Sequence, residues 1–214
     1  MNPLELHVRL QDALDFSIAW SQARPASRLQ SSNAARSGFF CAAVGKVLKS
    51  LTPFDSRLRQ IGFCESRHKF ESGEWMLDGA VVELDEHQFV RRIHVAMECE
   101  SSTSKIEFAT DFGKLLNVKA KTKVFLHGLD QITGKASDDL VSARCGLASQ
   151  LVRECDPYSD WFLGFWPSPK KVPGLPSLWD DFYGARDYAH LAQIRLYRFD
   201  GQGFSRVLPI PLAA

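Results

Sequence analysis

Residues 89–127 read FVRRIHVAMECESSTSKIEFATDFGKLLNVKAKTKVFLH, and the spacing of their hydrophobic residues changes along the way. Phe89–Glu100 predicts a strand, because its second half alternates between two faces. Lys105–Val118 carries an apolar stripe at helical spacing and predicts a helix, and Ser101–Ser104 before it offers several N-cap residues. Lys123–His127 predicts a further strand. A strand, a helix and a strand in this order are typical of an α/β fold.

Upstream of this stretch, the sequence predicts two helices and two short strands. The helices are expected at residues 4–20 and Gly38–Leu51, with a polar loop around Pro25 between them. Arg67–Leu84 predicts two extended runs joined by a tight hairpin turn at Ser72–Gly73. The chain therefore enters the central stretch as helix, strand, strand.

Downstream, Asp138–Glu154 predicts a helix and Trp161–Trp166 a strand. Pro167–Tyr183 contains four prolines and predicts an ordered loop. Ala192–Phe199 and Phe204–Leu208 predict a closing hairpin. The whole order predicts an α/β fold with a central mixed sheet flanked by helices.

Composition places the chain among ordinary globular proteins and excludes few classes of function. It has 214 residues, of which 45% are hydrophobic and 24% charged, and we expect one domain over residues 1–214. The net charge of +1 neither supports nor excludes a nucleic-acid partner. The five cysteines show no metal-ligand spacing and are expected to be free thiols. An acidic start without an apolar segment predicts no secretory signal, no run is long enough for a membrane span, and a cytoplasmic location is expected.

Three carboxylates stand out because they lie in apolar surroundings. Glu98 and Glu100 share one face at the end of the strand predicted for Phe89–Glu100, about 7 Å apart. Asp78 interrupts the apolar run around it and comes beside Glu98 if the two strands pair antiparallel. Buried like charges at this spacing are unfavourable unless a cation or a proton intervenes. The pattern therefore predicts a site for a hard divalent cation.

The motifs EWMLD at 74–78, HVAMECES at 94–101, DFGKLL at 111–116 and KVFL at 123–126 resemble the PD-(D/E)xK, or restriction-endonuclease-like, nuclease superfamily. The resemblance covers residues 35–130 and implies an α-β-β-β-α-β core, with residues 131–214 as an extension of the same domain. It implies that Asp78 and Glu98 bind Mg²⁺ or Mn²⁺ and that the carbonyl of Cys99 is a further ligand. Glu100 stands where the superfamily usually has lysine.

A lysine from the following helix is expected to replace the missing one. Lys114 matches the motif position in DFGKLL, but at about 100° per residue it falls roughly opposite the apolar stripe of the helix. Lys105, at the helix start, lies nearer that stripe. Both lysines remain candidates at this point.

Two further sets of side chains have both a functional and a structural interpretation. Basic residues near the carboxylates in sequence are candidates for phosphate contacts or for ordinary surface charge; they are Arg91, Arg92, Lys119, Lys121 and Lys123. Aromatic residues of one predicted strand are candidates for base stacking or, preferably, core packing; they are Trp161, Phe162, Phe165 and Trp166.

The sequence thus predicts a Mg²⁺-dependent nuclease acting on DNA. Asp78 and Glu98 bind the metal, Glu100 binds a second metal or activates water, and Lys114 or Lys105 stabilises charge on the phosphate. A homodimer is left open. One alternative is an inactive module of this fold that binds a partner in a DNA-processing or defence complex. The other is a structural α/β protein whose acids are only surface charges.

Overall fold

The computed structural model describes residues 1–22, 33–53, 58–62, 77–131, 133–168, 191 and 193–208. Within these residues the chain forms four helices and seven strands in the order α1(Pro3–Gln22), α2(Asn33–Ser50), β1(Leu58–Gly62), β2(Gly79–Leu84), β3(Val90–Glu100), α3(Lys105–Asn117), β4(Ala120–Leu129), α4(Gly134–Cys155), β5(Asp160–Pro167), β6(Arg195–Phe199) and β7(Phe204–Arg206). No helix among the described residues is both long enough and apolar enough to span a membrane.

All seven strands belong to one mixed sheet in which spatial order follows chain order. Neighbouring strands are antiparallel from β1 to β3 and again from β5 to β7. The central strands β3, β4 and β5 are parallel, and α3 and α4 provide the two crossovers that parallel neighbours require. The α/β fold with a mixed sheet is therefore confirmed.

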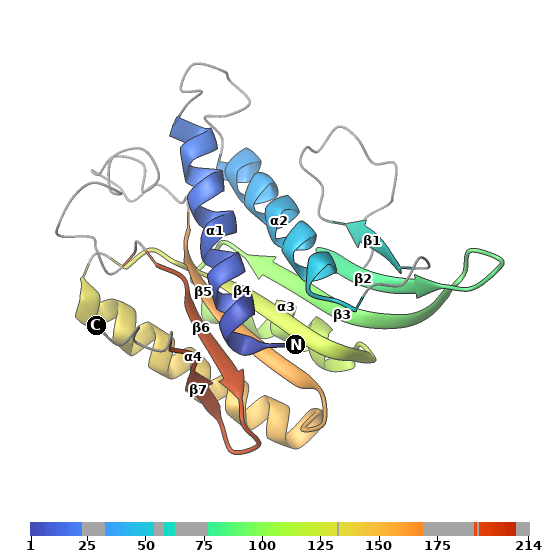
Figure 1. Cartoon of the computed structure of the whole chain (residues 1–214). Helices are drawn as coiled ribbons and strands as arrows, with labels where there is room; N and C mark the ends of the chain where they lie inside the picture. Colours follow the sequence, from blue (N-terminus) through green and yellow to red (C-terminus); the bar gives the residue numbers. More distant parts are fainter. Residues whose placement is uncertain are drawn as a thin grey trace, which may run out of the picture.

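The helices cover the two faces of the sheet as separate layers (Figure 1). Helices α1 and α2 lie side by side over one face, where Phe40 of α2 stacks on Trp166 of β5 with ring centroids 4.6 Å apart. Helices α3 and α4 lie on the opposite face, where Phe112 of α3 stacks on Trp161 of β5 at 5.0 Å. Because successive side chains point to opposite faces of a strand, both faces of the central strands are buried and must be apolar.

The layer under α3 is mainly aromatic. The ring of Phe108 lies 5.1 Å from that of Phe125 and 4.9 Å from that of His127, and all three residues are fully buried. Neither ring nitrogen of His127 has a hydrogen-bond partner among the described residues. Burial, helped by the charge of Arg144, lowers the pKa of His127 to about 3. His127 is thus a neutral member of the core.

Most predicted elements are confirmed, with shifted ends. Helix α3 begins at Lys105 as expected, and Ser104 caps it by accepting from the main-chain N–H groups of Ile106 and Glu107. Helix α2 begins at Asn33, five residues before the expected Gly38. Within the expected loop between the first two helices, residues 23–32 lie outside the described residues.

The first strand of the sheet precedes the two extended runs predicted within Arg67–Leu84, and the first of those runs lies outside the described residues. The strand that pairs with β2 is Leu58–Gly62, for which no strand was predicted. Its five residues, LRQIG, show no regular alternation that could mark a strand. The expected hairpin turn at Ser72–Gly73 and almost all of the expected loop 167–183 lie outside the described residues.

Candidate functional site

Asp78 lies directly before β2 and faces the end of β3. Gly79 pairs with Met97 in the antiparallel ladder, which brings Asp78 level with the end of the neighbouring strand. Its Oδ2 accepts a hydrogen bond from the main-chain N–H of Cys99 at 2.8 Å. Burial raises the pKa of Asp78 despite this hydrogen bond. The expected proximity of Asp78 and Glu98 is therefore present, although Asp78 precedes the strand instead of lying within it.

Glu98 is the most deeply buried acid of the site, with 2% of its surface exposed. It projects from β3 toward the α3 layer, because its register partner in β4 is Phe125, which packs under α3. Burial, and then the charge of Asp78, raises the pKa of Glu98 to about 8. Its Oε2 lies 3.4 Å from the Lys114 ammonium, while its Oε1 has no partner among the described residues. The Glu98 carboxyl group also shares a hydrogen bond with Asp78, and either a proton or a cation between the two acids would relieve their repulsion.

Lys114 is the lysine that contacts the carboxylates. Its Nζ lies 3.4 Å from Glu98 Oε2 and 2.7 Å from Asp111 Oδ1. The helical-wheel expectation that Lys114 points away from the site is wrong, because the site lies beside the flank of α3 and not beneath its apolar stripe. The long lysine stem can follow the helix surface to reach Glu98. Lys105 is exposed at the first position of α3, and none of the described ion pairs joins it to these acids.

Glu100 and Asp111 form the outer part of the site. Glu100 Oε1 accepts from the main-chain N–H of Ser102 at 2.5 Å, and its carboxyl group also shares a hydrogen bond with Asp111. Burial raises the pKa of Glu100, and the Asp111 carboxylate adds to the effect. Asp111 is the first residue of the DFGKLL motif, but the sequence alone did not mark it as a site residue. Its spacing of three from Lys114 was the available signal.

Cys99 contributes main-chain atoms only. Its N–H binds Asp78, whereas its thiol lies against Cys41 of α2 on the other side of the sheet. The four described cysteines, Cys41, Cys99, Cys145 and Cys155, are free thiols. A ligand role of Cys99 can therefore involve its carbonyl oxygen and not its sulfur.

Most of the basic and aromatic side chains considered as nucleic-acid contacts lie away from the carboxylates. Arg91 and Arg92 begin β3, eight or more residues from Glu100, which is roughly 25 Å along an extended strand. Lys123 is 1% exposed, and its ammonium contacts Asp156 Oδ2 at 2.5 Å, so it cannot reach a phosphate. The aromatic residues of β5 are fully buried and pack in the core; they are Trp161, Phe162, Phe165 and Trp166.

The donor set fits a hard divalent cation. The Lys114 ammonium contacts Glu98 and Asp111, and burial raises the pKa values of Asp78, Glu98 and Glu100. No group of three or more His, Cys, Asp or Glu side chains in the described part of the chain is arranged to hold a metal ion, so Asp78, Glu98 and Glu100 do not form a three-carboxylate cluster. Mg²⁺ does not need one, because it commonly binds one or two carboxylates and keeps waters or substrate phosphates as its other ligands.

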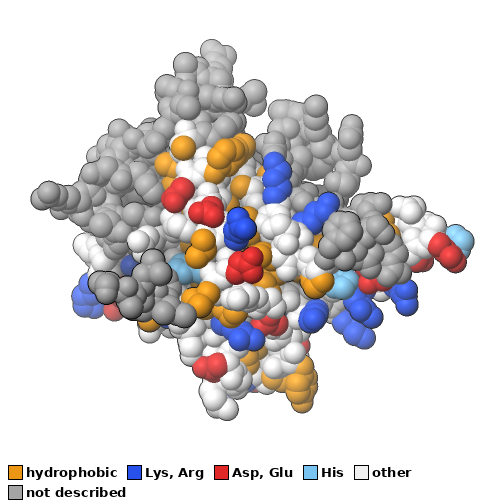
Figure 2. Space-filling view, in the orientation of Figure 1, with side chains coloured by type: hydrophobic (Ala, Val, Ile, Leu, Met, Phe, Trp, Pro, Cys, Tyr) orange, Lys and Arg blue, Asp and Glu red, His pale blue; other side chains and the backbone are white. Residues whose placement is uncertain are grey.

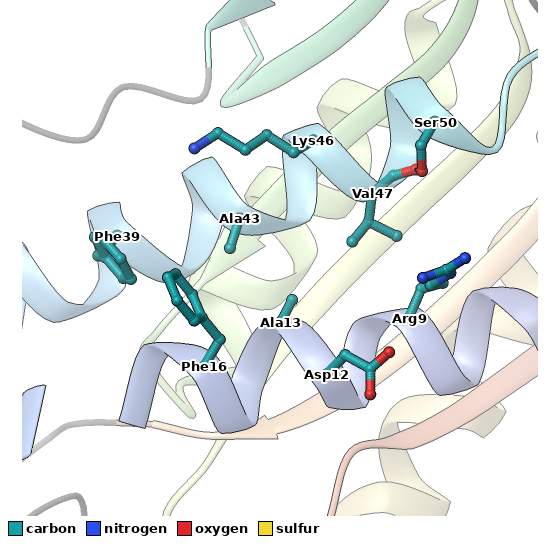
Figure 3. A pocket seen from close by; sticks show the side chains of 9 residues that line it. All are labelled: Arg9, Asp12, Ala13, Phe16, Phe39, Ala43, Lys46, Val47 and Ser50. Atoms are coloured by element: carbon teal, nitrogen blue, oxygen red, sulfur yellow. The ribbon is translucent and has the colours of Figure 1, made fainter. Parts of the chain in front are cut away.

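A separate groove of about 400 Å³ runs between α1 and α2 (Figure 3). Phe16 and Phe39 stack at one end of it, 5.6 Å apart, and Arg9, Asp12 and Lys46 supply its charged groups. The face that carries these helices mixes acidic, basic and hydrophobic side chains (Figure 2). The groove lies in the α1–α2 layer, so the sheet separates it from the carboxylates, which face α3.

Comparison of the chain with protein-family models, with curated proteins and with solved structures finds no match.

Proposed function

We propose that the chain is a metal-dependent phosphodiesterase that cuts DNA, and that α2, β1, β2, β3, α3 and β4 form a restriction-endonuclease-like core. The observation that carries the proposal is the convergence of Asp78 from the segment before β2, Glu98 from β3 and Lys114 from α3, with a buried oxygen of Glu98 left without a partner among the described residues. The element order α-β-β-β-α-β agrees with such a core.

Each residue of the site has a chemical role in this proposal. Asp78 and Glu98, with the Cys99 carbonyl, would hold Mg²⁺ or Mn²⁺, which when bound polarises a phosphate and acidifies a water. Lys114 donates to the non-bridging oxygens of the phosphate and stabilises their growing negative charge. Glu100 takes a proton from the attacking water, which its raised pKa favours at neutral pH, or helps to bind a second cation.

A cleavage assay on DNA and RNA of varied structure, with Mg²⁺ and Mn²⁺, tests the proposal. We expect metal-dependent cleavage by the wild type and a loss of at least about 100-fold in Glu98→Gln and in Asp78→Asn. Asp139→Asn is the matched control, because Asp139 is an exposed acid of α4 that pairs only with Lys135 in the described contacts. Metal-dependent cleavage that survives Glu98→Gln at full rate would refute the proposal.

A second function is favoured by two observations: the position usually held by lysine carries Glu100, and no group of three or more metal-binding side chains forms among the described residues. In this case the chain is an inactive module of the same fold that binds DNA or a partner subunit. It predicts binding without cleavage and without dependence on the metal. The same assay, run together with a gel-shift measurement in EDTA, separates the two functions.

A further inference from the structure

Asp111 makes the closer of the two carboxylate contacts to Lys114. Its Oδ1 lies 2.7 Å from Lys114 Nζ, shorter than the 3.4 Å between that ammonium and Glu98 Oε2. Asp111 and Lys114 lie three residues apart and share one flank of α3. Their side chains are 15% and 37% exposed, so the pair stands at the boundary between the buried carboxylates and solvent. Asp111 therefore holds the Lys114 ammonium in place along the surface of α3.

The proposed metal creates a conflict for Lys114. In the structure its ammonium lies 3.4 Å from Glu98 Oε2, and Glu98 is one of the two carboxylates that the proposed cation requires. Two cations beside the same carboxylate repel each other, and this repulsion is strong where water is scarce. A bound divalent cation must therefore weaken the contact between Lys114 and Glu98. Lys114 then needs a second partner if it is to stay beside the phosphate.

We propose that Asp111 is the positioning residue that holds Lys114 at the site when a divalent cation occupies Asp78 and Glu98. This inference rests on the proposed phosphodiesterase function. Asp111 acts through Lys114 and touches neither the metal nor the substrate. A flexible lysine without such an anchor loses its position, since a four-carbon stem has many rotamers.

Two alternative roles of Asp111 would give different experimental results. Asp111 shares a hydrogen bond with Glu100, so the two acids could instead bind a second cation together. An exposed ion pair at this spacing on a helix could also have no role beyond a small contribution to helix stability. The first alternative gives Asp111 an effect on metal binding that does not depend on Lys114. The second gives it no effect on turnover.

A double-mutant cycle with Asp111→Asn, Lys114→Gln and the double variant tests the inference. The measurements are kcat and KM for DNA cleavage with Mn²⁺, and calorimetric titration of each variant with Mn²⁺ alone. We expect kcat to fall about tenfold in Asp111→Asn and about 100-fold in Lys114→Gln, with KM changed less. The double variant is expected to match Lys114→Gln within about two- to threefold, because Asp111 has nothing left to position. Asp111→Glu should recover part of the rate.

Mn²⁺ binding gives a readout that does not depend on turnover. We expect Lys114→Gln to bind Mn²⁺ several-fold more tightly than the wild type, because the competing ammonium is gone. We expect Asp111→Asn to leave the number of bound ions unchanged. Lys135 and Asp139 form an exposed ion pair on α4, at 2.6 Å, and provide matched controls. Neutralising either of them should change neither kcat nor the affinity for Mn²⁺.

The outcomes separate this inference from the proposed function. If Asp111→Asn lowers kcat in the Lys114→Gln background as much as in the wild type, or reduces the number of bound Mn²⁺ ions, Asp111 acts independently of Lys114 and the inference is wrong. A wild-type rate in Asp111→Asn also refutes it while the proposed function stands. A wild type that neither binds Mn²⁺ nor cleaves DNA refutes both.

Discussion

The two oxygens of Glu98 have different surroundings. One faces Lys114, and the other is buried without a partner among the described residues. Burial and the neighbouring Asp78 raise the pKa of Glu98 to about 8, so the metal-free protein holds a proton there at neutral pH. A protonated carboxyl removes the repulsion in the same way that a cation would. In the proposed function, a bound cation would take the place of this proton.

The raised pKa makes the stability of the metal-free protein depend on pH. The unfolded chain releases the Glu98 proton near its ordinary pKa of 4.5, whereas the folded chain keeps it up to about pH 8. The folded state therefore binds more protons in this window, and its stability falls as the pH rises from about 4.5 to 8. Glu98→Gln should flatten this fall in EDTA and gain several degrees in Tm relative to the wild type between pH 5 and 8, since about 1 kcal/mol moves Tm by about 2–4 °C.

Melting curves across this pH range, read by circular dichroism, measure the effect. Glu86→Gln is the control, because Glu86 is an exposed acid between β2 and β3 with 87% of its side chain accessible. Parallel pH profiles for the wild type and Glu98→Gln would show that Glu98 ionises normally in the folded protein.

The sequence identified Asp78 and Glu98 because acids inside apolar runs are conspicuous in a single sequence. The motif match pointed to Lys114, whereas the helical wheel favoured Lys105. The wheel favours Lys105 only if the site lies under the apolar stripe of the helix, and the structure places the site beside it. Asp111 could not be found in this way. Its importance depends on which flank of α3 borders the end of β3, and that is decided by tertiary packing.

At the scale of elements, α3 connects the site to the core. Phe108, Phe112 and Leu115 bury one side of the helix against the sheet, and Lys114 and Asp111 project from the adjoining flank. The sequence predicted this helix to within one residue, because its cap and its periodicity both mark the ends. It missed β1, whose position comes from pairing with β2 and not from any pattern of its own.

The N-cap of α3 tests the connection between helix and site. Ser104→Ala removes the acceptor for two main-chain N–H groups and should cost about 1 kcal/mol, or about 2–4 °C in Tm. Thr133→Ala removes the equivalent cap of α4 and should cost a similar amount. Only Ser104→Ala should also lower kcat, by about two- to tenfold, because α3 carries Lys114. Equal kcat values for the two variants would show that the start of α3 does not govern the site.

At the scale of the whole molecule, the site lies where the carboxyl ends of the parallel strands meet the crossover helix α3. Open α/β sheets often bind ligands at this end of the strands. The helices α1 and α2 cover the opposite face, so Glu98 and Lys114 lie on the α3 side of the sheet. Burying several carboxylates there lowers the stability of the metal-free fold, and a cation that binds only the folded state restores it.

This linkage predicts that Mn²⁺ stabilises the folded chain against heat, and increasingly so as the pH rises. Binding only to the folded state at about 100 times Kd contributes about 2.7 kcal/mol, which corresponds to several degrees in Tm. The cation must displace the Glu98 proton, so the gain should be small at pH 6 and large at pH 8.5. EDTA should reverse it, and Asp78→Asn should abolish most of it while Asp139→Asn retains it. A gain in Tm that is the same at both pH values, or that persists in Asp78→Asn, would mean that Mn²⁺ binds elsewhere, because binding at this site must displace the buried Glu98 proton.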